Sequence, residues 1–183
     1  MPLVILIGAS GSGKTTIARA IQRRYAEEVE VLYFDQIGVP PVEEMVAAYG
    51  SGEAWQHAKT LAWMATLAQL ARSGHRLLFE GQTRLSFLAE GASVAGGLAY
   101  YPILVDCDDE TRSKRLAIER KQPELADENM MNWAQYLRSE ARRGGCEIVN
   151  TSLLSLDEGV SYVMARLNQS PHSTAGPAPS TFA

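Results

Sequence analysis

The residues best suited to chemistry form one short run near the N-terminus, Gly8-Ala9-Ser10-Gly11-Ser12-Gly13-Lys14-Thr15. The run fits G-x-x-x-x-G-K-[ST], in which glycines let successive backbone N–H groups turn inward around phosphate oxygens. In such a site we expect Lys14 to bridge the β- and γ-phosphates of a nucleotide and the Thr15 hydroxyl to bind Mg²⁺. Thr16 would add a hydroxyl near the α-phosphate. The alternative interpretation is a glycine turn followed by an exposed lysine.

The pattern of apolar residues predicts the elements that hold this run in place. Residues 3–7 are all branched and apolar, which is typical of a strand buried on both faces, and a helix is predicted over residues 14–26. Further strands are predicted over residues 29–34, 76–79, 100–105 and 147–149, and further helices over residues 53–73, 126–143 and about 156–167. Strands that alternate with helices indicate a three-layer α/β fold, with a parallel sheet of about five strands.

Acidic residues follow two of the predicted strands. Asp35 closes the second strand and would lie at the carboxyl edge of the sheet, where open parallel sheets bind ligands; the alternative is an Asx turn into Gly38. Glu80 follows the third strand, and its alternative is a solvated strand end. The sequence has neither the N-K-x-D element of a GTPase nor an L-S-G-G-Q signature, and it is too short for an AAA+ ATPase with an extra helical domain.

Over about residues 1–168 the sequence resembles the small P-loop kinases typified by adenylate kinase and shikimate kinase. The segment from Leu77 to Arg84, L-L-F-E-G-Q-T-R, is similar to L-L-D-G-F-P-R of the nucleoside monophosphate kinases. The resemblance implies that Glu80 lies near Mg²⁺ or its waters, that Arg84 binds the acceptor, and that Asp35 holds or deprotonates an acceptor hydroxyl. Because Gln-Thr replaces Phe-Pro, we favour a hydroxyl-bearing acceptor over a nucleoside monophosphate.

The resemblance also assigns roles to two longer segments. Residues 36–75 would form the acceptor-binding insert, in which Trp55 and His57 are candidates to line a pocket and Trp63 is expected in the core. Residues 112–143 resemble the lid of these kinases: they carry eight basic and five acidic side chains, a net charge of +3, whereas the rest of the chain carries −7.

Four arginines of the lid-like region are candidate phosphate ligands. Arg115 and Arg120 match the paired arginines of the first lid helix, and we expect them to act in catalysis. Arg138 and Arg142 lie four apart on a predicted helix and therefore share a face, where they would contact the acceptor. Guanidinium groups suit this task because they stay charged and match phosphate geometry. The alternative is a solvated helix face with Glu/Arg pairs.

Composition limits the partners and the compartment. The formal net charge of −4 argues against binding of nucleic acid or an anionic membrane. Two cysteines, Cys107 and Cys146, do not make a disulfide framework and are expected to be reduced core residues. There is no basic leader and no run of about 18 apolar residues, so we expect a cytoplasmic protein without membrane contact. Residues 169–183 lack charged side chains and contain three prolines, which predicts a flexible tail.

Together these features predict Mg²⁺-dependent transfer of the ATP γ-phosphoryl group to a small acceptor. A hydroxyl-bearing metabolite or an antibiotic-like compound is favoured as acceptor, and a nucleoside or nucleotide is the alternative. A different class of function remains open, an ATP-binding regulatory module that turns over no small molecule.

Overall fold

Five parallel strands form one sheet in the computed structural model, which describes residues 2–169. The predicted tail lies, from residue 170 on, outside the described residues. The order across the sheet is β2-β3-β1-β4-β5, with every pair parallel. The bounds are β1 Leu3–Ile7, β2 Val29–Tyr33, β3 Arg76–Gly81, β4 Tyr101–Asp106 and β5 Glu147–Asn150. The predicted α/β class, the five strands and their parallel arrangement are therefore confirmed.

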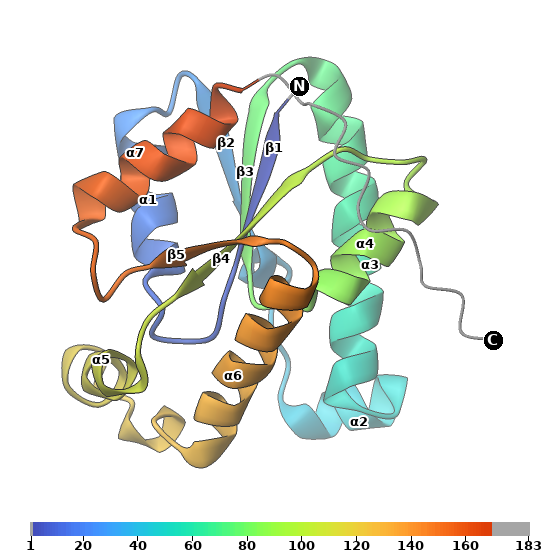
Figure 1. Ribbon diagram of the computed structural model, residues 1–183. Coiled ribbons are helices and arrows are strands. Elements are labelled where there is room, and N and C mark those ends of the chain that lie inside the picture. The colour runs from blue at the N-terminus through green and yellow to red at the C-terminus, as the bar shows by residue number, and fades with distance from the viewer. Residues whose placement is uncertain (1, 170–183) are drawn as a thin grey trace.

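Helices cover both faces of the sheet, as the ribbon in Figure 1 shows: α1 and α7 lie on one side, and α3, α4 and α6 on the other. The bounds are α1 Lys14–Arg24, α2 Val42–Tyr49, α3 Gly52–Leu70, α4 Leu85–Val94, α5 Asp109–Lys114, α6 Glu128–Arg143 and α7 Leu156–Leu167. Short 3₁₀ helices span Phe34–Ile37, Ala71–Ser73 and Pro123–Leu125, and a π-helical turn spans Arg115–Glu119. Within residues 2–169, none of the helices has the length and apolarity that crossing a bilayer requires.

Side-chain caps explain where four of these helices begin. Ser51, Asp108, Asp127 and Ser155 each accept a hydrogen bond from the backbone N–H three residues further on, which satisfies an amide that the helix itself leaves unpaired. Because Asp127 caps α6, this helix starts at Glu128, two residues later than predicted.

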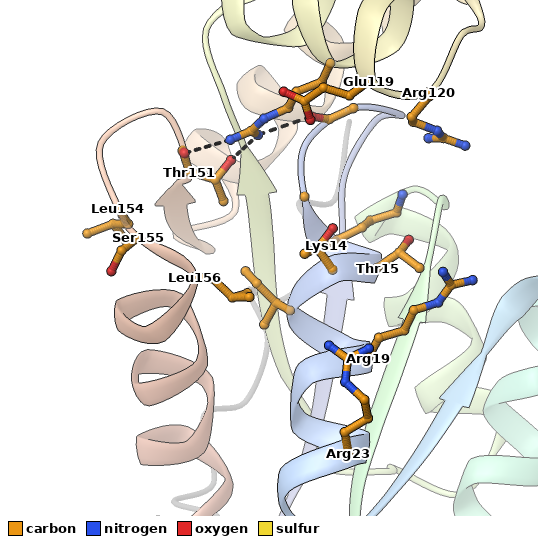
Figure 2. A pocket seen from close by; sticks show the side chains of 15 residues that line it. Lys14, Thr15, Arg19, Arg23, Glu119, Arg120, Thr151, Leu154, Ser155 and Leu156 are labelled. Carbon is orange, nitrogen blue, oxygen red and sulfur yellow. Dashed lines mark hydrogen bonds between the residues drawn. The ribbon is translucent and has the colours of Figure 1, made fainter.

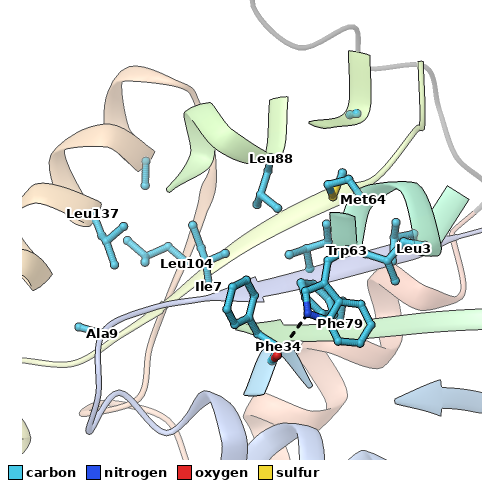
Figure 3. Close-up of a cluster of buried hydrophobic side chains, with 14 of the residues drawn as sticks. Leu3, Ile7, Ala9, Phe34, Trp63, Met64, Phe79, Leu88, Leu104 and Leu137 are labelled. Atoms are coloured by element: carbon cyan, nitrogen blue, oxygen red, sulfur yellow. Dashed lines mark hydrogen bonds between the residues drawn. The ribbon is translucent and has the colours of Figure 1, made fainter. Parts of the chain in front are cut away.

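The core lies in two layers, one on each face of the sheet. Figure 3 shows the layer under α3, α4 and α6, where Trp63 and Phe79 pack with ring centroids 5.0 Å apart. The Trp63 indole N–H donates to the Phe34 carbonyl at 3.2 Å, so this buried polar group is satisfied. Trp63 is thus a core residue, as expected. Cys107 is buried and Cys146 half-buried, and both are free thiols.

Candidate functional site

The glycine-rich loop between β1 and α1 has a backbone built around two glycines. An added Cβ at Gly8 would lie 2.2 Å from the Val105 carbonyl oxygen, so a side chain there collides with β4. Gly13 precedes α1 with φ of 90°, a left-handed conformation that glycine adopts without strain. Within the described residues the N–H groups of Lys14, Thr15 and Thr16 have no acceptor, as expected for the first turn of a helix. The loop therefore presents free donors at a helix N-terminus, the arrangement that binds phosphate.

The predicted lysine and glutamate meet directly. Lys14 Nζ lies 3.4 Å from a Glu80 carboxylate oxygen, and the two residues are only 8% and 6% exposed. Sheet register explains the pairing, because Glu80 on β3 lies opposite Leu6 on β1, the strand that leads into the loop. Removed from bulk water, the ammonium and the carboxylate hold each other in place at the mouth of the loop.

The side chains at this point fit a bound Mg²⁺. The Thr15 hydroxyl and the Glu80 carboxylate are hard oxygen donors, which Mg²⁺ prefers, and Mg²⁺ in phosphate sites takes one or two protein oxygens together with phosphates and water. Residues 2–169 contain no cluster of three or more His, Cys, Asp and Glu side chains that would hold a metal alone. The donor set matches an ion that arrives with its nucleotide.

A cleft of about 580 Å³ opens over the loop and is rich in positive charge (Figure 2). It is bounded by the loop, one face of α1, the π-helical turn and the connection from β5 to α7. Its charged lining consists of five cations and one carboxylate, namely Lys14, Arg19, Arg23, Arg115, Arg120 and Glu119. Thr151, Leu154 and Leu156 supply a less polar wall on the far side. The cleft thus combines an anion-binding floor with an apolar flank, which suits the triphosphate and base of a nucleotide.

The predicted pair Arg115 and Arg120 lies on one widened turn. The Arg120 N–H donates to the Arg115 carbonyl at 2.9 Å, five residues back, and this is the hydrogen bond of a π-helix. Residues five apart are brought onto the same side by this turn, so both arginines reach the cleft. Arg120 is exposed there, without an ion pair to another described residue. Arg115 instead hydrogen-bonds to the Gly11 carbonyl and to Thr151.

The predicted pair Arg138 and Arg142 is not brought to the cleft. Arg138 Nε donates to an Asp106 carboxylate oxygen at 2.6 Å, and the other oxygen of that carboxylate accepts from the fully buried Arg112 at 2.7 Å. The Arg142 side chain is exposed in the last turn of α6 and makes no hydrogen bond to another side chain or backbone group of the described residues. Asp106 therefore engages Arg138, while the Arg142 side chain lies in solvent, so the two guanidinium groups form no common cluster; their contact with the acceptor stays a prediction.

Asp35 lies at the predicted edge of the sheet. Tyr33, the last residue of β2, is in register with Glu80, and Asp35 follows it by two residues in the 3₁₀ helix. The Asp35 side chain is exposed, and its backbone carbonyl accepts from the Gly38 N–H at 3.0 Å. Asp35 and Glu80 therefore project from the ends of two neighbouring strands.

Arg84 is held in a polar and aromatic setting. It forms an ion pair with Glu53 at 2.8 Å and donates to the Tyr136 hydroxyl at 3.3 Å. Its guanidinium carbon lies 4.9 to 5.6 Å from the ring centroids of Phe87, Trp133 and Tyr136. The positive charge of Arg84 is thus already compensated within the protein.

Neutral polar groups connect the loop to the predicted acceptor side. Ser10 Oγ donates to the Gln82 side chain at 3.3 Å, and the Gln56 amide donates to the Gln82 carbonyl at 2.9 Å. The two aromatic candidates of the insert separate. Trp55 is buried and also lines a second cavity of about 420 Å³ beneath α2, whereas His57 contacts Glu90 at 2.9 Å on the surface.

Comparison with known proteins places the chain in a family. Residues 4–132 match a family described as an AAA domain. The chain belongs to this family. The match runs from β1 into α6 and so contains the loop, the Lys14–Glu80 pair and the π-helical turn. No curated protein matches the sequence.

Solved kinase structures share the fold of this AAA domain. A sugar kinase from Janibacter sp. HTCC2649 superposes with a TM-score of 0.67 at 15% identity, over 93% of this chain and 96% of that chain. A shikimate kinase from Bacteroides thetaiotaomicron gives 0.63 at 12% identity, over 92% and 99%. The APS kinase of Mycobacterium tuberculosis, solved with AMPPNP and APS, gives 0.60 at 18% identity, over 92% and 98%. The chain thus has the fold of the small P-loop kinases.

Four residues of the site were not among the sequence candidates. Arg19 and Arg23 line the cleft from α1, and their spacing of four and eight residues from Thr15 is a helical signal that identifies one face. Arg112 and Thr151 contact the back of the loop from more than 100 residues away in the sequence, and no local pattern identifies them.

Proposed function

We propose that the protein is a Mg²⁺-dependent kinase that transfers the γ-phosphoryl group of ATP to a hydroxyl group on a small molecule. The observation that carries this proposal is the buried Lys14–Glu80 pair, whose lysine lines a cationic cleft. A lysine at the end of a phosphate loop stabilises the β- and γ-phosphates. The fold shared with sugar, shikimate and APS kinases supports the same reaction class.

Each candidate residue in and beside the phosphate loop has a place in this reaction. Lys14 and the loop amides from Gly8 to Thr16 hold the triphosphate, and Glu80 orients Lys14. Thr15 and Glu80 would hold Mg²⁺, which when bound neutralises charge on the phosphate oxygens. Asp35, at the neighbouring strand end, orients the acceptor hydroxyl and takes its proton late in the transfer.

Two exposed arginines are available to neutralise charge on the transferred group. Arg120 faces the cleft from the π-helical turn, and Arg19 reaches it from α1. In Figure 2 the Arg19 side chain extends toward the end of α1 that carries Lys14 and Thr15. Neither has an ion-pair partner among residues 2–169, so both can bind phosphate oxygens without first breaking a contact.

The acceptor is a hydroxyl-bearing compound without a phosphate of its own. Arg84 is the cation that the resemblance assigns to an acceptor phosphate, and its charge is taken up by Glu53 and three aromatic rings. The groups that join the loop to the insert are the amides of Gln56 and Gln82 and the Ser10 hydroxyl. Such groups suit the hydroxyls of a sugar-like or antibiotic-like molecule.

The setting proposed for this reaction is the cytoplasm, because two free thiols fit a reducing compartment. Nucleic acid is not proposed as a partner. Although the cleft is cationic, the whole chain carries a formal net charge of −4.

The proposal is tested by ADP release in the presence of Mg·ATP and a panel of sugars, polyols, aminoglycoside-like and chloramphenicol-like compounds, nucleosides and nucleotides. We expect release to be stimulated by a hydroxyl-bearing, phosphate-free compound. Asp35→Asn is expected to lower kcat by about 10²-fold or more while ATP binding persists. The control Asp157→Asn changes an exposed carboxylate of α7 that pairs with Arg24 and is not among the residues that line the cleft, and it leaves kcat unchanged. Tight ATP binding without stimulation by any acceptor would support the regulatory module instead.

A further inference from the structure

The back of the phosphate loop accepts hydrogen bonds from side chains far away in the sequence. The Cys107 thiol reaches the Gly11 carbonyl at 3.6 Å, and three shorter contacts come from nitrogen and hydroxyl donors. Three successive carbonyl groups, those of Ser10, Gly11 and Ser12, each accept a hydrogen bond from outside the loop. Arg112 donates to Ser10 at 2.7 Å, Arg115 donates to Gly11 at 3.3 Å, and the Thr151 hydroxyl donates to Ser12 at 2.7 Å. None of these donors is supplied by the glycine-rich motif itself.

Thr151 hydrogen-bonds both to the loop and to Arg115, and so links these contacts to each other. Its hydroxyl accepts from Arg115 at 2.8 Å while it donates to the loop, and its backbone carbonyl accepts from the second nitrogen of Arg115 at 3.0 Å. Its backbone N–H donates to the Asp106 carbonyl at 2.8 Å, so the residue is also anchored to the end of β4. Thr151 follows β5 directly, which gives the loop a rigid reference.

Peptide geometry connects these contacts to phosphate binding. In a planar trans peptide the C=O of one residue and the N–H of the next point in opposite directions. Carbonyls held toward Arg112, Arg115 and Thr151 therefore turn the N–H groups of the next residues away from those side chains. Gly11 and Gly13 line the cleft, and within the described residues neither N–H has an acceptor, whereas the Ser12 N–H donates within the loop to the Ala9 carbonyl at 3.3 Å.

We infer that Thr151 is a positioning residue for the nucleotide, oriented by Arg115: it holds the Ser12 carbonyl outward so that the free Gly13 N–H faces the phosphates. This inference rests on the proposed ATP binding, and it moves Arg115 from the predicted catalytic role to a role in shaping the loop. Arg112 completes the set from a fully buried position. The lid-like region, residues 112–143, then binds two groups: the loop carbonyls through Arg112 and Arg115, and the nucleotide through Arg120.

The test is the affinity of the full-length protein for Mg·ATP without acceptor, measured by calorimetry for Thr151→Val and Thr151→Ser. Valine keeps the shape of threonine and removes the hydroxyl, so we expect the Kd for ATP to rise by about tenfold, the effect of losing about one hydrogen bond that orders a charged ligand. Serine keeps the hydroxyl and is expected to restore affinity to within about threefold of wild type. Thr66→Val, which removes an exposed hydroxyl that bonds within α3 at 3.2 Å, is the matched control and leaves the Kd unchanged.

A second measurement separates positioning from mere stability. Amide hydrogen exchange of Ser12, whose N–H donates to the Ala9 carbonyl at 3.3 Å, is expected to speed up in Thr151→Val, while amides of the β1 core exchange as in wild type. An unchanged Kd in Thr151→Val, with wild type binding ATP, would overturn the inference and leave the proposed function intact. If wild type itself binds no ATP, the proposed function fails and the inference fails with it. An equal loss of affinity in Thr151→Val and Thr151→Ser would also overturn it, because the hydroxyl would then be irrelevant.

Discussion

One carboxylate, that of Asp106, compensates two guanidinium groups beneath the phosphate loop. One oxygen accepts from Arg112 at 2.7 Å and the other from Arg138 Nε at 2.6 Å. The Arg112 side chain is 0% exposed, whereas the Arg138 side chain is 25% exposed. Removal of the Asp106 charge would leave Arg112 as a buried cation without an anionic partner.

The substitution Asp106→Asn isolates this effect because the two side chains have the same shape. Asparagine offers one acceptor oxygen and replaces the other with an NH₂ donor, which faces a guanidinium that also donates. Breaking a buried ion pair on one side costs about 3–5 kcal/mol, and most of that cost comes here from Arg112. In a chain of this size each kcal/mol lowers the melting temperature by about 2–4 °C, so the midpoint is expected to fall by about 6 °C or more.

The assay is urea unfolding followed by tryptophan fluorescence, with the free energy of unfolding taken by linear extrapolation. The matched control is Asp109→Asn, which removes a carboxylate that is 61% exposed and 3.7 Å from the same Arg138. We expect the control to lose less than about 1 kcal/mol, because exposed pairs contribute little. Similar losses in the two variants, or a loss below about 1 kcal/mol for Asp106→Asn, would refute the idea that a buried charge dominates.

Three further predictions concern other parts of the molecule. Arg19→Met is expected to weaken ATP binding by about tenfold through loss of a charge-assisted hydrogen bond to phosphate, whereas Arg72→Met, on the surface outside the cleft, has no effect; calorimetry compares them, and equal affinities would remove Arg19 from the site. Burial raises the pKa of Cys146 to about 11 and also raises the pKa of Cys107. Both thiols are therefore expected to resist iodoacetamide at about pH 8 until urea unfolds the protein, and rapid alkylation of the native protein, seen by mass spectrometry, would contradict this. Burial opposes ionisation of Glu147, but hydrogen bonds from Arg166, Tyr101 and Tyr162 outweigh burial and lower the pKa of Glu147. The stability that the Glu147 carboxylate contributes is therefore present above its unfolded pKa of about 4.3 and is lost as pH falls through the folded pKa. Glu147→Gln should flatten the acid limb of the melting curve, and an unchanged limb would show that Glu147 is not its source.

Local patterns predicted most of the fold and the floor of the site. The apolar run from Leu3 to Ile7 and the glycines after it define a strand, a turn and a helix between Leu3 and Arg24, and these need no distant contact to be recognised. Glu80 was predicted to follow the third strand, but it lies within β3, which runs to Gly81; its position near the carboxyl edge follows from the parallel sheet. The Lys14–Glu80 ion pair follows from that register.

The fate of the arginines was not predictable from local patterns. A guanidinium in the sequence looks the same whether it will bind phosphate, a carboxylate or a backbone carbonyl. Arg138 is engaged by Asp106 and Arg115 by Thr151, and both contacts depend on how α6 and the end of β5 pack against the loop. The spacing of Arg115 and Arg120 is the one local signal, because two residues five apart lie on the same side of a π-helical turn.

We propose that this protein moves a phosphoryl group from ATP to a hydroxyl group of a small molecule. The most direct test is phosphorus NMR of the wild-type protein with Mg·ATP and each acceptor that stimulates ADP release. We expect a new phosphate monoester resonance that grows as the γ-phosphate resonance of ATP declines, together with the mass of one phosphoryl group on the acceptor. Neither signal is expected for Lys14→Met. Conversion of ATP to ADP and inorganic phosphate alone, with no phosphorylated acceptor from the panel, would contradict this proposal.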